Sequence, residues 1–143
     1  MTKPDPTSRL SSVREATVNI SNLRLRTFIG FNPEEQEKPQ DVLINIEIRY
    51  RLGSGVLEDQ VDAALNYKVI TKRVIRHVEE GRFLLLEKLT SDVLDICRED
   101  SSVTYARVRI DKPNALRFAD SVSIALEYSR SETRSLRLLE KAS

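Results

Sequence analysis

The sequence is poor in the side chains that build metal sites and disulfides. Its 143 residues include one cysteine, Cys97, one histidine, His77, and no tryptophan. A lone cysteine excludes a disulfide within the chain, and one thiol with one imidazole falls short of the usual His/Cys zinc site. We therefore expect neither a metal nor another cofactor, and we expect a reducing, cytoplasmic setting.

Long apolar runs and an excess of one charge are also absent. No apolar run approaches the roughly 18–20 residues of a membrane span, and the first residues, MTKPDPTSRLSS, lack the apolar core of a signal peptide. The 23 basic and 22 acidic side chains nearly cancel, giving a net charge of +1. This balance predicts neither a nucleic acid nor a membrane surface as a partner. The P-loop, GxGxxG, HExxH and GxSxG motifs are missing too, so none of the sites that these motifs mark is indicated.

What remains is the composition of one globular domain. Hydrophobic residues make up 40% of the chain and charged residues 31%, which is typical of a folded domain rather than a disordered segment. Residues 1–15, with several Pro, Ser and Thr, are predicted to form a flexible N-terminal arm. Residues 16–130 are predicted to form a single domain, and residues 131–143 a C-terminal tail.

Periodicity predicts the order of the elements. Alternation of apolar and polar residues predicts four strands, at 16–30, 41–50, 102–110 and 121–128, with a bulge near residues 21–22. Helical spacing predicts two helices, from residue 65 to about 81 and from 84 to about 100. The order β-β-α-α-β-β favours an α+β fold, in which an antiparallel four-stranded sheet carries both helices on its apolar face.

The opposite face of this sheet is predicted to be charged. Its residues include Glu47, Arg49, Arg51, Arg107, Arg109 and Glu127. A four-stranded sheet also has two open edges, which can pair with other strands. Joining sheets edge to edge in a ring would remove the edges and enclose the charged face in a wet lumen. A monomer with one solvated face accounts for the same pattern, so the residues alone leave both arrangements open.

Four polar residues at the ends of predicted elements are candidates for chemistry. Tyr67 falls in the first turn of the first helix, where it is also compatible with a core tyrosine. Glu87, in the first turn of the second helix, is either a solvated glutamate or, among leucines, a buried anchor for two adjacent N–H donors of a ligand. Lys112 emerges at the end of the third strand, as a solvated loop lysine or, if desolvated, as a base or proton relay. Glu35 belongs to NPEEQEKPQ, whose three glutamates favour an exposed loop.

His77 and Cys97 are interpreted as structural residues. His77 is next to an apolar position of the first helix and has no evident partner in the sequence. Cys97 follows an apolar residue on the buried side of the second helix, so we expect it in the core.

Four stretches, taken together and in this order, resemble the dihydroneopterin aldolase family. They are FIGFNPEE, ALNYKVITKRVIRHVEEGRF, LLEKLTSDVLDI and IDKPNALRFADSVSIALEY, and the resemblance spans about residues 18–130. The stretches NLRLRTFIG, ALNY, LLEKLT, VTYA and ALRFADSVS are more similar to the epimerases of this family than to its aldolases. Its aldolases tend to have a Ser- or Thr-Lys-Pro-Gly loop, whereas here Asp111 precedes the lysine and Asn114 takes the place of the glycine.

The resemblance implies the tunnelling fold, in which subunits join their sheets into a tetrameric ring and two rings stack into an octamer. It also implies sites at subunit boundaries. Mapped residue by residue, the pterin-anchoring glutamate of the family falls on Glu87, its catalytic lysine on Lys112 and its loop glutamate on Glu35. Its site tyrosine, supplied by the neighbouring subunit, falls on Tyr67.

The activity implied is cofactor-free retro-aldol chemistry on a pterin. We expect inversion at C2′ of 7,8-dihydroneopterin triphosphate to give dihydromonapterin triphosphate. An aldolase that releases glycolaldehyde and a non-catalytic pterin-binding ring protein are the alternatives. Arg117 is the candidate for holding the triphosphate, and Lys68 and Arg26 are weaker candidates for the same role.

Overall fold

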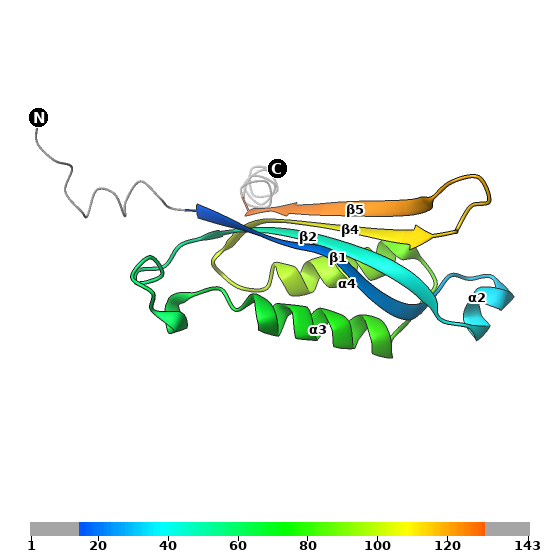
Figure 1. Ribbon diagram of the computed structural model, residues 1–143, viewed down its shortest axis with the longest axis horizontal. Coiled ribbons are helices and arrows are strands. Elements are labelled where there is room, and N and C mark those ends of the chain that lie inside the picture. The colour runs from blue at the N-terminus through cyan, green and yellow to red at the C-terminus, as the bar shows by residue number, and fades with distance from the viewer. Residues whose placement is uncertain (1–14, 131–143) are drawn as a thin grey trace, which may run out of the picture.

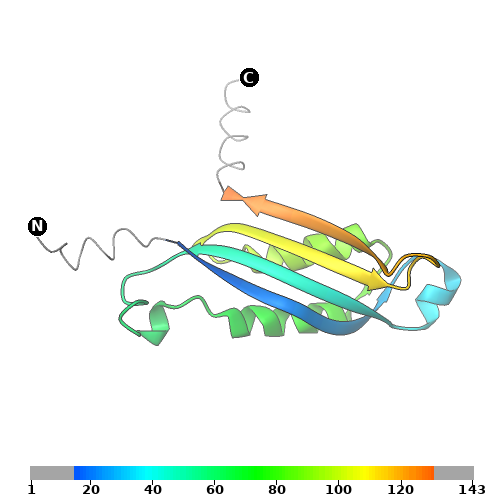
Figure 2. The same cartoon turned by 45° about the horizontal axis from the view of Figure 1, so that its top comes forward.

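The computed structural model describes residues 15–130, which form a sheet with two helices packed beneath it (Figure 1). Both long helices lie on the same side of the sheet, and in Figure 2 no helix of residues 15–130 covers the other side. The predicted α+β class and the placement of the helices are therefore confirmed. The predicted arm and tail lie outside the described residues, apart from Glu15, where the first strand begins.

Four long strands form where the alternation predicts them. They are β1 (Glu15–Ile29), β2 (Gln40–Arg51), β4 (Val103–Pro113) and β5 (Ser121–Ser129). Each long strand is antiparallel to its long neighbour, in the order β1-β2-β4-β5. The register between β1 and β2 shifts between Ile20 and Leu23, where Asn22 has a positive φ of 55°. This irregularity confirms the predicted bulge. Asparagine suits the position, because it tolerates left-handed backbone better than most residues do.

A fifth strand was not predicted. β3 (Arg82–Phe83) pairs in parallel with Phe28 and Ile29 of β1, and the full order is β3-β1-β2-β4-β5. The prediction of a four-stranded, wholly antiparallel sheet was therefore wrong. Two residues are too few to show an alternation, and only the return of the chain beside the end of β1 makes them a strand.

Each long helix begins two residues later than predicted, as α3 (Tyr67–Glu80) and α4 (Leu86–Cys97). Asn66 caps α3, because its side chain accepts a hydrogen bond from the backbone N–H of Val69 at 3.1 Å. Two short helices in the links, α2 (Pro33–Glu37) and the 3-10 helix η1 (Val61–Ala63), were too brief for a periodic signal. Within residues 15–130, no helix combines the length and the apolar character needed to cross a membrane.

The core lies between the sheet and the two helices. Its fully buried side chains include Val42, Ile44 and Ile48 of β2, Val74 and Val78 of α3, Leu89 and Val93 of α4, and Val108 and Ile110 of β4. Cys97 is also fully buried, and burial raises the pKa of its thiol to about 12. The prediction that this cysteine belongs to the core is confirmed.

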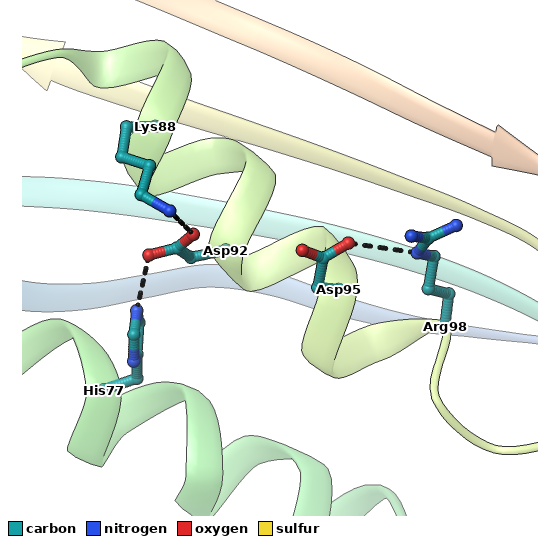
Figure 3. Close-up of polar contacts among 5 residues, drawn as sticks. All are labelled: His77, Lys88, Asp92, Asp95 and Arg98. Carbon is teal, nitrogen blue, oxygen red and sulfur yellow. Dashed lines mark hydrogen bonds and ion pairs between the residues drawn. The ribbon is translucent and has the colours of Figure 1, made fainter.

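His77 has a partner that its sequence neighbourhood did not reveal. Its Nε2 lies 2.9 Å from Oδ2 of Asp92, which also accepts a hydrogen bond at Oδ1 from Lys88 at 2.8 Å (Figure 3). Burial raises the pKa of Asp92, but the hydrogen bonds from Lys88 and His77 outweigh it and hold this pKa below its ordinary value. This partner was not evident in the sequence, because the carboxylate comes from α4, 15 residues further along the chain. The interpretation of His77 as a structural residue fits this contact, which joins α3 to α4.

Candidate active site

An ammonium and a carboxylate meet at one end of the sheet. Lys112 is the penultimate residue of β4, and its Nζ forms an ion pair with Oε2 of Glu35 on α2. The two side chains are only 14% and 21% exposed. Their separation of 77 positions in the sequence explains why each residue, taken alone, resembled a solvated loop residue.

Glu35 is held on several sides. Its Oε2 also accepts from Nε2 of Gln40 at 3.3 Å, and its Oε1 accepts from the backbone N–H of Asn32 at 3.4 Å. The hydrogen bond from Lys112 is the largest influence on the pKa of Glu35 and holds it below the usual range, against the opposing effect of burial. Glu35 is therefore an ordered carboxylate at neutral pH, and the prediction of an exposed loop residue was wrong.

Two residues in this cluster were missed by the sequence reasoning. Gln40 joins Glu35 to the end of β1, because the same Nε2 donates to the carbonyl of Ile29 at 2.7 Å. Gly30 has a φ of 125°, and a Cβ built on it would collide with the carboxyl group of Glu35. A glycine just before the NPEE turn was the one signal in the sequence that pointed to a close approach here.

Glu87 lies at the same end of the fold, in the first turn of α4, as predicted. The backbone N–H of Gly30, just before α2, donates to the carbonyl of Phe83 at 2.9 Å, which ties the entry to α4 to the Glu35 turn. The preceding Leu84 and Leu85 are exposed, and so is Glu87. The idea that these leucines bury the carboxylate was wrong.

Tyr67 lies far from this cluster. It is the first residue of α3, and its side chain is 49% exposed, so the interpretation as a core tyrosine was wrong. The 14 residues of α3 lead from Tyr67 toward β3 and the Glu35 turn (Figure 1). At about 1.5 Å per residue, this path is roughly 20 Å long. One chain therefore brings Lys112 and Glu35 together but leaves Tyr67 at the opposite end.

The predicted phosphate-binding cations are all exposed. Arg117 stands in the loop between β4 and β5, with its guanidinium 5.4 Å from the ring centroid of Phe118. Lys68 is exposed on α3, next to Tyr67. Arg26, on β1, already pairs with Asp41 at 3.4 Å.

Asn114 explains how this loop keeps its shape without the glycine typical of the aldolases. Its φ is 62°, in the left-handed region that glycine enters most easily and asparagine more readily than other residues. Its backbone N–H donates to the carbonyl of Asp120 at 3.3 Å, which closes the loop. The exchange of glycine for asparagine therefore leaves the turn after Lys112 intact.

The ammonium–carboxylate pair is suited to proton transfer with a hydroxyl group. A sheltered ammonium can donate a proton or a hydrogen bond to an oxygen that becomes negative, and the ion pair with Glu35 keeps the ammonium in place. Within residues 15–130, no three His, Cys, Asp or Glu side chains are grouped as a metal ion would require.

Comparisons with known proteins agree with this architecture. The family model described as dihydroneopterin aldolase (FolB) matches residues 18–127. The dihydroneopterin triphosphate 2′-epimerase of Escherichia coli (strain K12) is 54% identical over 115 residues, which cover 80% of this chain and 96% of that protein. The enzyme of the same name from Pseudomonas aeruginosa (strain PAO1) is 53% identical over 115 residues, covering 80% and 94%.

A solved structure provides a third comparison. The E. coli dihydroneopterin aldolase in complex with neopterin superposes with a TM-score of 0.74 and 28% identity, covering 80% of this chain and 99% of that one. The family model and the epimerases each match most of the described domain, so the chain belongs to the dihydroneopterin aldolase family.

Proposed function

We propose that this chain inverts the configuration at C2′ of 7,8-dihydroneopterin triphosphate. The observation that carries the proposal is the similarity to the 2′-epimerases, at 54% identity over nearly their whole length, against 28% for the aldolase whose structure was compared. The half-buried pair of Lys112 and Glu35 supports an enzyme rather than a passive binder, because it places a proton donor and its counter-ion in a sheltered position. We also propose a cytoplasmic location, since the lone thiol of Cys97 suits a reducing compartment.

The proposed site has an anchor and a reacting centre. The carboxylate of Glu87 accepts hydrogen bonds from the 2-amino and N3–H groups of the pterin. Lys112 acts at the 2′-hydroxyl, directly or through a water molecule, and Glu35 keeps its ammonium in place. Tyr67 of the neighbouring subunit delivers the proton that N5 of the pterin takes up. Exposed positions for Glu87 and Tyr67 support these roles, because both side chains are then available to a ligand.

The proposed reaction needs no external electron carrier. The amine form of Lys112, directly or through a water molecule, takes up the 2′-hydroxyl proton and becomes the ammonium that Glu35 holds, while the C1′–C2′ bond breaks and C2′ becomes an aldehyde. The electron pair of that bond passes to the pterin, whose C6=N5 imine becomes an enamine as N5 is protonated. The aldehyde fragment then rotates, and C1′ adds to its other face. N5 loses its proton as the C6=N5 imine forms again, and Lys112 returns the proton to the 2′-oxygen. The product is dihydromonapterin triphosphate, the C2′ epimer.

Such a site requires more than one subunit, so we propose a ring. The sheet supports this, because in the described part of the chain β5 pairs with β4 alone, and the face away from the helices carries ion pairs such as Arg107–Glu127 at 3.4 Å. Edge-to-edge pairing of sheets would enclose this face. We propose four subunits in a ring and two stacked rings, an octamer whose sites lie at subunit boundaries.

Retention of the aldehyde distinguishes an epimerase from an aldolase. A cation that holds the triphosphate keeps the fragment in the site until it adds again. Arg117 is our choice for this role, because its loop follows Lys112 and its side chain is exposed. Lys68 and Arg26 are weaker choices, and the ion pair with Asp41 makes Arg26 the less available of the two.

The test of the reaction is incubation with dihydroneopterin triphosphate followed by chiral analysis of the pterin product. We expect dihydromonapterin triphosphate to accumulate. Accumulation of glycolaldehyde triphosphate would identify an aldolase instead, and ligand binding without any turnover would identify a non-catalytic pterin-binding protein. A weak aldolase activity beside epimerisation is compatible with the proposal, because both reactions share the cleavage step.

The phosphate role of Arg117 is tested separately. Arg117→Ala is assayed on triphosphorylated and unphosphorylated dihydroneopterin, and we expect kcat/KM to fall at least tenfold more for the triphosphate. Arg76→Ala is the matched control, since Arg76 is an exposed arginine of α3 paired with Glu80. An equal loss for both substrates would exclude the phosphate role.

A further inference from the structure

Asp111 and Lys112, which precede the last residue of β4, have charged side chains on opposite faces of the sheet. Lys112 points to the helix side, where it meets Glu35, and Asp111 points to the polar side, as successive residues of a strand do. Two residues before Asp111 on the same face, Arg109 places Nε 3.0 Å from its Oδ1 and Nη2 3.1 Å from its Oδ2. The side chain of Asp111 is only 13% exposed, so this contact is sheltered.

A third group joins Asp111 to the next strand. The hydroxyl of Ser121 donates to Oδ2 of Asp111 at 3.1 Å. Ser121 is the first residue of β5, and its register partner on β4 is Pro113. Proline has no N–H to give to the ladder, so the backbone pairing is weakened beside Lys112. The hydrogen bond between Asp111 and Ser121 spans the two strands at that point.

These contacts restrain the backbone of Lys112. The peptide between Asp111 and Lys112 cannot rotate without breaking the contacts of Asp111 on one face or the ion pair with Glu35 on the other. We propose that Asp111 is a positioning residue for the epimerisation, which acts through Arg109 and Ser121 to orient Lys112. This inference rests on the proposed role of Lys112 in that reaction.

The main variant is Asp111→Asn, which keeps the shape and an acceptor oxygen but removes the charge that holds Arg109. We expect kcat to fall roughly tenfold to a hundredfold, because a misplacement of about 1 Å in an active site has effects of this size. KM and the affinity for neopterin are expected to stay within twofold, since Asp111 does not contact the proposed pterin anchor. Glu127→Gln is the matched control, because it breaks an Arg–carboxylate pair on the same face, away from Lys112. We expect it to leave kcat unchanged.

A second pair of variants separates positioning from general damage to the fold. Ser121→Ala removes the hydroxyl and is expected to lower kcat severalfold, whereas Ser121→Thr keeps a hydroxyl and is expected to retain most of the activity. If Asp111→Asn does not fold, this pair tests the same hydrogen bond. Equal kcat for the Ala and Thr variants would overturn the inference.

A double variant distinguishes failure of this inference from failure of the proposed function. If Asp111 acts through Lys112, then Asp111→Asn should change the residual kcat of Lys112→Ala less than twofold. The inference is refuted if Asp111→Asn lowers kcat as much in that background as in the native chain, or leaves kcat unaltered while Lys112→Ala abolishes turnover. Unchanged epimerisation by Lys112→Ala alone would instead refute the proposed role of the lysine.

Discussion

A mixture of two inactive variants should regain activity if the site spans two subunits. Tyr67→Phe removes the proposed proton donor, and Lys112→Ala removes the proposed base. Within one chain Tyr67 begins α3, a helix roughly 20 Å long that leads toward the Glu35 turn where Lys112 lies, so no single subunit can bring the two residues together. In a ring built from both variants, a site is intact only where a Tyr67→Phe chain supplies Lys112 and its Lys112→Ala neighbour supplies Tyr67.

Random assembly sets the size of the effect. In rings refolded from an equal mixture, a site needs the tyrosine variant to supply Lys112 and the lysine variant to supply Tyr67. Each condition is met half the time, so about a quarter of the sites should be intact. We therefore expect about a quarter of the native epimerase activity, against almost none for either variant alone.

The assay compares three samples at one total subunit concentration. They are each variant refolded alone, the two refolded together, and the two mixed after separate refolding. Only the second sample should regain activity, and native mass spectrometry of differently tagged chains should show hybrid oligomers there. Hybrid oligomers without activity would refute a shared site, and a fully active monomer would refute the ring.

Three further predictions follow from the pKa values. The hydrogen bond from Lys112 lowers the pKa of Glu35. The ion pair that holds Lys112 is therefore fully formed above the ordinary pKa of 4.5 and is lost as the pH falls through the lowered pKa. The pH–rate profile should therefore lose activity below pH 4.5, and Glu35→Gln should lower kcat about tenfold and remove this limb. Asp92→Asn should lower the free energy of unfolding by about 1–2 kcal/mol in urea at pH 7, and the difference should vanish as the pH falls below the ordinary value of 3.8. Cys97, with a pKa of about 12, should resist iodoacetamide at pH 8 in the folded protein, as measured by mass spectrometry, and react once urea unfolds it.

Local patterns predicted the layers of the fold but not the contacts between distant segments. Alternation along β2 identified its buried face, and helical spacing placed Tyr67 and Glu87 correctly in first turns. The exposure of Tyr67 was not predictable, because an aromatic residue at a core-like spacing has the same pattern whether or not a neighbour covers it. The ion pair between Glu35 and Lys112 joins segments 77 residues apart, and no local rule connects them.

The proposed ring could also bridge the distance between Tyr67 and Lys112 within a single chain. A subunit contributes four long strands, which at about 4.8 Å each span roughly 19 Å across the sheet. Strands in closed barrels tilt by about 35–45° from the barrel axis. The same residue in two neighbouring subunits is therefore offset along the strand direction by the width of one sheet times the tangent of the tilt, roughly 13–19 Å. The path from Tyr67 along α3 is of similar length, roughly 20 Å. Closure of the barrel in the right sense would therefore bring Tyr67 of one subunit near Lys112 of the next without any movement within a subunit. If the proposed ring forms, the separation of Tyr67 and Lys112 by about the length of a helix would make catalysis depend on assembly.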